Sequence, residues 1–410
     1  MARKRQDEKD ETAIDMVSSL GFSPIGDGTY TNVKDFLPTF IPQWDYLLGG
    51  GIPFGRLTEI YADNAVGKST LLIHLNRVAN ALGTDVFWID TEETSDGNRM
   101  ESLGIDQNHT FIFKPQKNDT SGISIEKVGK VIENIINKYK DNDELKDTPL
   151  LVIWDSLGGT NSQAAIDAEI GENKQRGREA GATTEVFKKL TPMLKEVNIA
   201  LVVINQVRAN QNKRFDWDPD FVSSGGKAFG HFASLRLALS RSGTDKGIYW
   251  RDTKETEVGH GVNMKVIKSK QQRSGISAVA DVFNAWVMKN GVLVNGFDWE
   301  YNIYSEARGN HNTKGIGTPN TLIKASAGYK SYTREDGTEI KKYEPDFIKA
   351  MKDDPTLTAE IFDRLCKDRW DIGHPRYLDN EHINCDVWPG VKEIREYFNS
   401  LPEEQTKNLD

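Results

Sequence analysis

The possible folds of this chain are narrowed most by the stretch Ala62-Asp63-Asn64-Ala65-Val66-Gly67-Lys68-Ser69. It follows the apolar run Leu57–Tyr61 and opens a helical pattern, Lys68–Leu82. The spacing is that of a phosphate-binding loop, with Ala62 in place of the leading glycine. In such a loop, backbone N–H groups and a helix N-terminus surround a phosphate. Lys68 adds a charge near the β- and γ-phosphates, and Ser69 adds a hydroxyl for Mg²⁺. The stretch, with Thr70 after it, predicts a site for ATP.

Acids at the ends of two other apolar runs are the candidates for the rest of the site. Asp155 follows Leu150–Trp154 and is predicted to hold Mg²⁺ through water. The run Val86–Ile89 leads into Asp90, Thr91, Glu92 and Glu93, at the carboxyl edge where open α/β sheets bind ligands. Hydrolysis needs a group that activates water. Glu92 is the candidate, with Asp90 and Glu93 as alternatives that spacing alone does not rank.

Apolar runs alternate with helical patterns over residues 38–300, which predicts an α/β fold with a mostly parallel sheet and flanking helices. The expected strands are Leu57–Ala62, Val86–Asp90, Thr110–Phe113, Leu150–Asp155, Ile199–Asn205 and Leu235–Ser240. The expected helices include Lys68–Leu82, Ile125–Tyr139 and Thr184–Val197. We divide the chain into an N-terminal arm (1–35), a core (36–300) and a C-terminal domain with a polar tail (301–410).

The composition excludes several classes of protein. No apolar run approaches the roughly 20 residues that span a bilayer, and no signal peptide is evident at the N-terminus, so we expect a cytoplasmic or nucleoid protein. Two cysteines are too few for a disulfide framework or a four-cysteine zinc site. The net charge of −9 does not indicate a nucleic-acid binder, although a local basic groove can occur on an acidic protein.

Several blocks, in order, resemble one family, the RecA-type DNA recombinases. They are Gly49–Tyr61 before the phosphate loop, Ile89–Glu92, Val203–Arg208, Ser224–Phe229 and Phe232–Leu237. Together they cover roughly residues 40–275. The resemblance ranks Glu92 first as the catalytic glutamate. It also implies that Gln206 senses the γ-phosphate and couples it to a DNA-binding loop behind it.

The run Val266–Lys270 matches another motif of the family, in which two lysines reach the ATP of the adjacent subunit. Lys268 and Lys270 are two residues apart, so on a strand they point to one face. The resemblance therefore implies that both contact a γ-phosphate in trans, as an arginine finger does. The alternative is an exposed basic strand. Arg99 stands where the family often has a tyrosine against the adenine, and a guanidinium can stack in its place.

Two segments correspond to the family's DNA loops. The first, about Gly158 to Gly181, carries Arg176 and Arg178. The second, about Val207 to Gly226, interleaves basic and aromatic residues in a way that suits single strands. Its candidate DNA-binding residues are Arg208, Lys213, Arg214, Phe215, Trp217, Phe221, Gly225 and Gly226. Asp216, Asp218 and Asp220 interrupt them, but a calcium loop is excluded because the central glycine is missing and Lys227 stands twelfth. The alternative is an ordinary surface loop.

The resemblance implies a DNA-dependent ATPase with a RecA-like core, an N-terminal oligomerisation arm and a smaller C-terminal α+β domain. Such a protein forms helical filaments on single-stranded DNA and pairs them with duplex DNA in recombination and repair, with a recombination mediator and a single-strand-binding protein as expected partners. Leu322–Ala325, Gly328-Tyr329 and the helical stretch Pro345–Met351 resemble RecA's C-terminal domain, which helps load duplex DNA. Ala62 in the phosphate loop, Arg99 in place of a tyrosine and the aspartates of the second DNA loop depart from the family pattern. Such departures are typical of a divergent member, such as a phage-encoded one acting in its host's cytoplasm. The alternatives are a hexameric helicase or translocase and a nucleotide-switched regulatory protein.

Overall fold

The computed structural model describes the core of the chain and part of its C-terminal region. The described residues are 33, 35–92, 96–113, 123–168, 175–209, 221–223, 226–242, 248–249, 257–271, 273–289, 292–310 and 321–371. The expected arm, apart from residues 33 and 35, and the stretch from 372 lie outside them. Residues from Asp35 onward form one compact unit. The boundary expected at residue 300 falls inside helix α9 (Trp299–Ala307), and the division into a core and a C-terminal domain stays a prediction.

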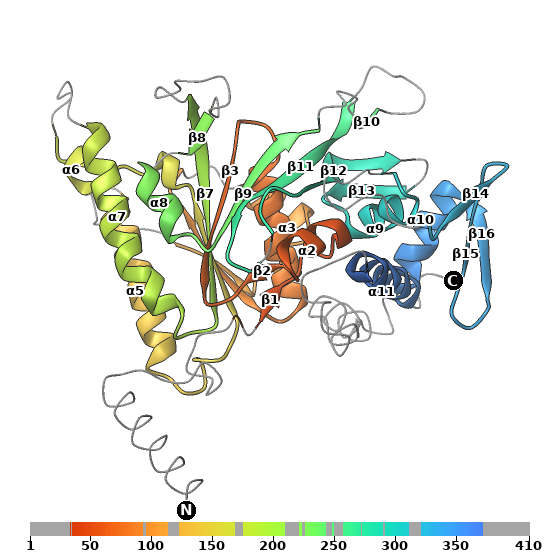
Figure 1. Ribbon diagram of the computed structural model, residues 1–410, viewed down its shortest axis with the longest axis horizontal. Helices are drawn as coiled ribbons and strands as arrows, with labels where there is room; N and C mark the ends of the chain where they lie inside the picture. The colour runs from red at the N-terminus through yellow and green to blue at the C-terminus, as the bar shows by residue number, and fades with distance from the viewer. Residues whose placement is uncertain are drawn as a thin grey trace, which may run out of the picture. The chain divides into compact units, whose positions relative to one another are not determined.

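A large twisted sheet organises the described part of the chain (Figure 1). Its strand order is β13-β12-β11-β9-β3-β7-β6-β4-β5, and β8 (Phe221–Ser223) and β10 (Ile248–Tyr249) pair with β7 and β11. The run from β9 to β5 is parallel throughout, which confirms the α/β fold class. Its strands are β9 (Leu235–Arg241), β3 (Arg56–Ala62), β7 (Ile199–Ala209), β6 (Leu150–Asp155), β4 (Asp85–Asp90) and β5 (Thr110–Ile112).

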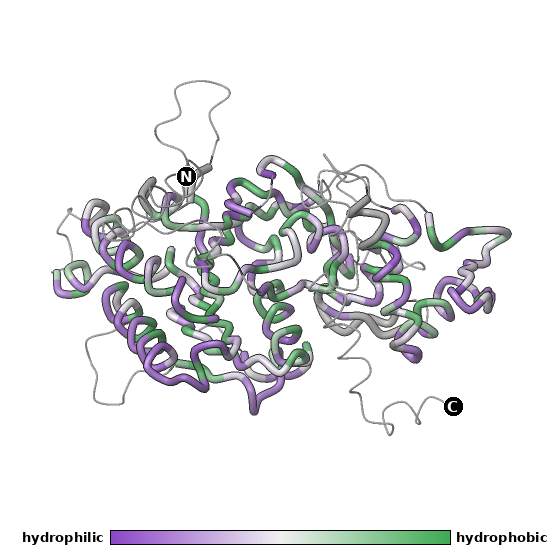
Figure 2. The backbone as a smooth tube through the Cα atoms, turned by 60° about the horizontal axis from the view of Figure 1, so that its bottom comes forward, coloured by the Kyte–Doolittle hydropathy of each residue, from purple (hydrophilic) through white to green (hydrophobic). Residues whose placement is uncertain are grey.

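The central strands β3, β7 and β6 are buried on both faces, which explains why they are nearly continuous apolar runs, whereas β5 at the edge is largely exposed. On β7, Val202 faces one core together with Leu71 of α3 (Lys68–Ala81), and Leu201 faces the other. The second core is completed by α5 (Ile125–Lys140), α7 (Gln175–Leu194) and α8 (Gly226–Phe232). Figure 2 shows hydrophilic positions along the outer sides of the helices and apolar positions toward the centre. Helices on both faces leave the carboxyl edge of the strands as the place for a ligand.

Helix α7 begins earlier than the expected Thr184 and ends at Leu194. Gly177 and Gly181 weaken the local helix signal, so apolar spacing identifies only the later turns. In the structure the helix continues through both glycines, and the Thr184 hydroxyl donates to Ala180 O at 2.7 Å. Short elements complete the core: β1 (Phe36–Leu37), β2 (Ile52–Pro53), α2 (Pro42–Leu48), α4 (Gly97–Ser102), η2 (Leu157–Gly159) and α6 (Gln163–Ile166).

Beyond β9, three long antiparallel strands extend the sheet, which the apolar runs did not predict. They are β11 (Glu257–Ser269), β12 (Ser277–Lys289) and β13 (Val292–Gly296). The remaining elements are a three-stranded sheet of β14 (Lys324–Ser326), β15 (Tyr329–Thr333) and β16 (Glu339–Tyr343), followed by α10 (Glu344–Asp353) and α11 (Pro355–Asp371). Lys352 of α10 bonds Asp298 beside α9 at 2.6 Å. No helix among the described residues is both long and apolar enough to cross a membrane.

Candidate nucleotide-binding site

Strand register brings the predicted site residues to one edge of the sheet. Asp90 at the end of β4 pairs with Asp155 at the end of β6. Ala62 at the end of β3 pairs with Gln206 of β7. Because these strands are parallel, their carboxyl ends meet at the same edge. Three segments that are far apart in sequence therefore converge beside the phosphate loop.

The loop between β3 and α3 has the backbone that a phosphate cradle needs. Gly67 takes a φ of 115° just before α3, where a side chain would be strained, and the Leu71 N–H donates to Gly67 O at 2.9 Å. Ala65 also has a positive φ, of 57°. Ala62, by contrast, is part of β3 and has no positive φ, so its backbone does not require the glycine usual at this position. The loop ends at the N-terminus of a long helix, which favours an anion.

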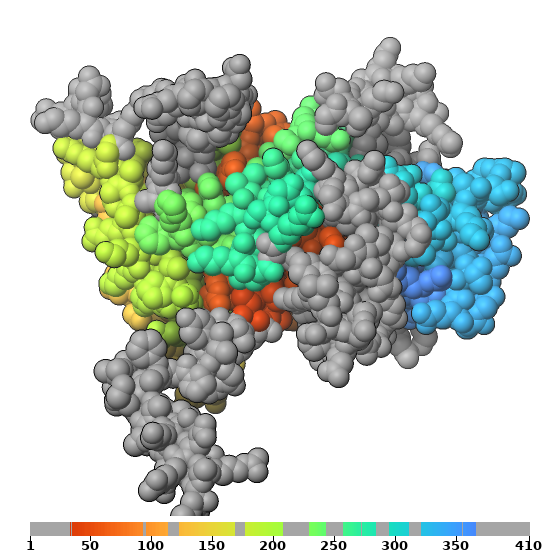
Figure 3. All heavy atoms as spheres, in the orientation of Figure 1, coloured from red at the N-terminus to blue at the C-terminus, as the bar shows by residue number. Residues whose placement is uncertain are grey.

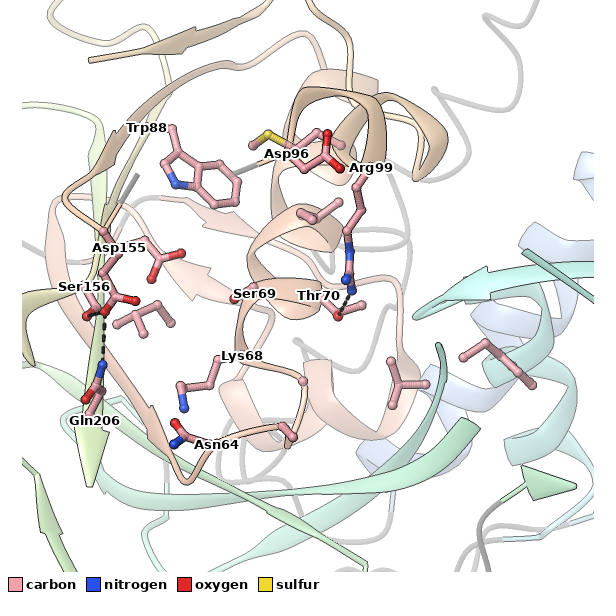
Figure 4. A pocket seen from close by; sticks show the side chains of 18 of the residues that line it. Asn64, Lys68, Ser69, Thr70, Trp88, Asp96, Arg99, Asp155, Ser156 and Gln206 are labelled. Carbon is pink, nitrogen blue, oxygen red and sulfur yellow. Dashed lines mark hydrogen bonds between the residues drawn. The ribbon is translucent and has the colours of Figure 1, made fainter. Parts of the chain in front are cut away.

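Lys68 is held inside this loop by two backbone carbonyls. Its Nζ donates to Asp63 O at 2.7 Å and to Ala62 O at 2.9 Å. Burial lowers the pKa of Lys68, against the opposing effect of Asp63, Asp155 and Glu92. Figure 4 shows Lys68, Ser69 and Asp155 around the same cavity. The Lys68 ammonium group therefore lies next to the place where phosphates are predicted to bind.

Negative charge accumulates opposite Lys68. Burial, followed by the charges of Glu92 and Asp90, raises the pKa of Asp155 to about 7. Carboxylate and hydroxyl oxygens are the ligands that Mg²⁺ prefers, and it usually takes one or two protein ligands together with nucleotide phosphates. The donor set of Asp155 and Ser69 fits this requirement, and the crowding of carboxylates favours a cation beside them.

Of the three competing acids, the two that the structure describes, Asp90 and Glu92, differ in what they contact. Asp90 is buried, and its Oδ1 accepts the Glu92 N–H at 3.1 Å, so Asp90 shapes the turn. The side chain of Glu92 instead meets Gln206, whose Nε2 donates to Glu92 Oε1 at 3.0 Å (Figure 4). Ser156 also donates its hydroxyl to this oxygen. Glu93 lies outside the described residues. The geometry thus places Glu92 in contact with Gln206, the residue that the family resemblance predicts to sense the γ-phosphate.

Much of the loop, together with Glu92, Asp155 and Gln206, lines one cavity of about 670 Å³, a size typical of small-molecule sites. Arg99 of α4 lies on its wall, where its Nη2 donates to the Thr70 hydroxyl at 3.3 Å. Sequence reasoning missed several other lining residues: Ile73, Trp88, Asp96, Met100, Ser156, Ile204, His260, Val282 and Phe283. Asp96 could have been found from its N-cap position, since it accepts the Asn98 N–H at 3.0 Å. Val282 and Phe283 come from β12, which no local pattern connects with the loop.

Lys268 and Lys270 do not behave as a matched pair in the single chain. Lys268 Nζ donates to Gly230 O at 2.8 Å and to His231 O at 2.9 Å, at the C-terminal end of α8. Lys270 lies just past the end of β11 and is exposed. A bulge shifts the pairing of β11 with β9 between Val266 and Lys268. This bulge lies before both lysines, and the two side chains differ in their surroundings within the single chain.

The predicted DNA-binding residues are only partly described. Arg176 and Arg178 lie in the first turns of α7, and the side chain of Arg178 donates to Ala164 O at 3.0 Å, between α7 and α6. Arg208 belongs to β7 and Phe221 to β8, which pair through Ala209 and Phe221, and Gly226 begins α8. The others lie outside the described residues: Lys213, Arg214, Phe215, Trp217 and Gly225. The pairing of β7 with β8 thus begins at Val207, next to Gln206, and lies within the bounds of the second expected loop.

Comparison with known proteins gives a consistent result. The family model for the RecA N-terminal domain matches residues 24–285, more than half of the chain. A mitochondrial DNA repair protein, the recA homolog of Dictyostelium discoideum, is 26% identical over 273 residues, which cover 66% of this chain and 55% of that protein. Protein RecA of Fusobacterium nucleatum is 27% identical over 67% of this chain and 69% of that protein. Protein RecA of Cereibacter sphaeroides is 26% identical over 78% of this chain and 80% of that protein.

Proposed function

Because the chain belongs to the RecA family, we propose that it is an ATP-dependent DNA recombination and repair protein. In this proposal, subunits assemble as a helical filament on single-stranded DNA and pair it with a homologous duplex. A recombination mediator and a single-strand-binding protein are the proposed partners, and the place of action is the cytoplasm or nucleoid, or a host's cytoplasm. Two relatives named RecA support this function, as does a third named as a DNA repair protein.

The nucleotide is assigned to the cavity of about 670 Å³. The loop from Ala62 to Thr70 surrounds the phosphates, and Lys68 leaves the carbonyls of Ala62 and Asp63 to meet the β- and γ-phosphates. Arg99 covers the base from α4. Ser69 and Asp155 are the residues that hold Mg²⁺, which neutralises phosphate charge when bound.

The contact between Gln206 and Glu92 carries the proposal. Glu92 orients the attacking water and takes its proton, and Gln206 holds one oxygen of that carboxylate. Gln206 lies on β7, which continues to Ala209 and pairs there with β8 at the edge of the second expected DNA loop. A change in that loop on DNA binding therefore reaches Gln206 along β7, and reaches Glu92 through the hydrogen bond between the two side chains.

DNA and the neighbouring subunit complete the site in this proposal. The second loop binds single strands through Arg208, Lys213, Arg214 and the aromatic residues Phe215, Trp217 and Phe221, with Gly225 and Gly226 closing it. Arg176 and Arg178 of α7 add contacts from the first expected loop. Lys268 and Lys270 approach the γ-phosphate of the ATP held by an adjacent subunit.

ATP hydrolysis at moderate salt, with and without single-stranded DNA, tests this function. We expect strong stimulation by DNA, and we expect the variant Glu92→Gln to lose it while still binding ATP. Electron microscopy of the same samples should show helical filaments. Rings would favour a helicase. Turnover that ignores DNA even at low salt would overturn the proposal in favour of a nucleotide-switched regulator.

A further inference from the structure

The short turn after β6, Ser156 to Gly159, touches both members of the Glu92–Gln206 pair. Ser156 is buried, and its Oγ lies in hydrogen-bond contact with Glu92 Oε1. An ionised carboxylate only accepts, so the serine hydroxyl must be the donor. The same Oγ accepts the Gly159 N–H at 3.1 Å. The hydroxyl proton is therefore directed to Glu92 by a bond that the turn itself provides.

Two donors from different strands share one oxygen of Glu92. Gln206 Nε2 approaches Oε1 at 3.0 Å from β7, and Ser156 approaches it from the end of β6. Both bonds end on Oε1, so Oε2 is not needed to hold the side chain. This division fits a carboxylate that is anchored by one oxygen and acts on water with the other.

The two glycines of the turn make the approach possible. A Cβ on Gly159 would stand 2.6 Å from Glu92 Oε1 and 2.9 Å from Glu92 Cγ. A Cβ on Gly158 would stand 3.1 Å from Gln206 Cβ and 3.2 Å from the Gln206 backbone N. Neither glycine has a positive φ, so the structure needs their lack of a side chain and not their conformational freedom.

The turn is itself fixed by a buried network of hydroxyl groups. Thr91 Oγ1, next to Glu92, donates to Ser156 O at 3.0 Å. Thr160 Oγ1 donates to the same carbonyl at 2.6 Å and accepts the indole N–H of Trp154 at 3.2 Å. Trp154 and Thr160 are both buried. The segments that follow β4 and β6 are thus tied together, and a buried network of this kind holds its members in one arrangement.

From these contacts we propose that Ser156, Gly158 and Gly159 form a seat for Glu92, and that Ser156 is a positioning residue for hydrolysis. The inference rests on the proposed role of Glu92 as the group that activates water. Ser156 holds Oε1 whether or not DNA is bound. Gln206 adds a second bond whose geometry depends on β7 and therefore on the DNA loop. The seat sets the basal position of Glu92, and Gln206 adjusts it.

Two substitutions test the seat by different physical routes. Ser156→Ala removes the donor, and Gly159→Ala pushes the carboxylate aside without removing any polar group. A displacement of about 1 Å in a reacting group costs roughly 10²-fold in rate, so we expect kcat to fall by about that factor in both. The KM for ATP and the affinity for a non-hydrolysable ATP analogue should change less than about twofold, because neither residue belongs to the phosphate loop. Thr148→Ala, which also removes a hydroxyl but at an exposed residue before β6 that does not line the cavity, is the control.

A second background separates positioning from a general structural effect. In Glu92→Asp the carboxylate is one methylene shorter and should no longer reach the Ser156 hydroxyl. Adding Ser156→Ala to that variant should therefore change kcat less than about twofold, since coupled residues are not additive. An equal loss in both backgrounds would overturn the seat, as would parental turnover in both Ser156→Ala and Gly159→Ala. Normal turnover in Glu92→Gln would instead contradict the proposed function, so the two failures are distinguishable.

Discussion

Lys68 and Lys268, the two lysines that we propose to bind γ-phosphates, each donate to two backbone carbonyls, but in different parts of the fold. Lys68 rests on the carbonyls of Ala62 and Asp63, inside its own phosphate loop. Lys268 rests on those of Gly230 and His231, at the end of α8. Burial lowers the pKa of both. The acids near Lys68 raise its pKa and so oppose the effect of burial. The charges of Lys270 and Arg236 instead lower the pKa of Lys268 further.

Under the proposed function, one chain holds only half of the site in working position. The half with Lys68, Asp155 and Glu92 is assembled around a cavity. Lys268 instead stabilises the C-terminal end of α8 in its own chain, because a cation at a helix C-terminus is favourable. Figure 3 shows the segment from α8 to β12, in green and teal, at the surface beside α7. A nucleotide on a neighbouring subunit must therefore compete with α8 for Lys268.

Removing Lys68 should have the largest effect. In Lys68→Ala we expect turnover to fall by about 10³-fold, the upper range for losing one group that stabilises transition-state charge. The affinity for ATP should fall as well, since Lys68 also binds the phosphates in the ground state. Steady-state hydrolysis and titration with a fluorescent ATP analogue measure the two effects. Lys265→Ala, an exposed lysine of β11, serves as the control. Turnover within tenfold of the parent would show that this lysine is not part of the site.

The buried carboxylate between the two lysine regions should matter most for stability. Glu59 of β3 accepts Asn205 Nδ2 at 3.0 Å and pairs with Arg236, which packs under Gly230 of α8. Breaking a buried pair leaves an uncompensated charge, so Glu59→Gln should lower the free energy of unfolding by about 3 kcal/mol in urea. The more exposed pair of Glu257 and Arg241 gives a control, because Glu257→Gln should cost less than about 1 kcal/mol. Equal losses would mean that Glu59 does not act as a buried ion.

Lys268→Ala should separate the two halves of the site. We expect turnover in the presence of DNA to fall by about 10²-fold, less than the ~10³ or more of an arginine finger, because Lys270 remains. ATP affinity of the dilute chain should stay within about twofold, since Lys268 does not line the cavity. Mixing this variant with Glu92→Gln should restore part of the activity, because some interfaces then combine an intact Glu92 with an intact Lys268. Mixtures no more active than either variant alone would contradict a role in trans.

Short sequence patterns predicted the residues of the half-site around Lys68, Asp155 and Glu92, because single loops and strand ends place these side chains. The six expected strands of the parallel sheet are all present, and the central ones are the clearest because strands buried on both faces leave continuous apolar runs. Their register alone brings Asp90 beside Asp155 and Ala62 beside Gln206. The sequence alone was therefore enough to place Asp90 and Asp155 at the carboxyl edge of the sheet. Spacing did not rank the candidate catalytic acids, and it was the family resemblance that put Glu92 first; the structure adds the contact of Glu92 with Gln206, 114 positions away.

The other half depends on contacts that leave no periodic signal. The resting place of Lys268 comes from α8, 37 and 38 positions earlier in the chain. Alternation along the strand does not indicate that Lys268 contacts α8 whereas Lys270, past the end of β11, is exposed. The sequence around Gly159 does not indicate that a Cβ at this position would collide with the side chain of Glu92. Such features follow from how elements pack, and a single sequence records packing only indirectly.

The smallest expected effect concerns α8 itself and tests whether Lys268 really has two positions. A cation at a helix C-terminus contributes roughly 0.3–1 kcal/mol, so Lys268→Ala should speed amide exchange in Ala228–Phe232 by about two- to fivefold without nucleotide. Lys265→Ala, on the same strand but exposed, should leave this exchange unchanged. Exchange at the parental rate in Lys268→Ala would mean that the carbonyls of Gly230 and His231 do not depend on the lysine. The loss of turnover and the loosening of α8 are separate consequences of one substitution, since the first requires a neighbour's ATP and the second requires none.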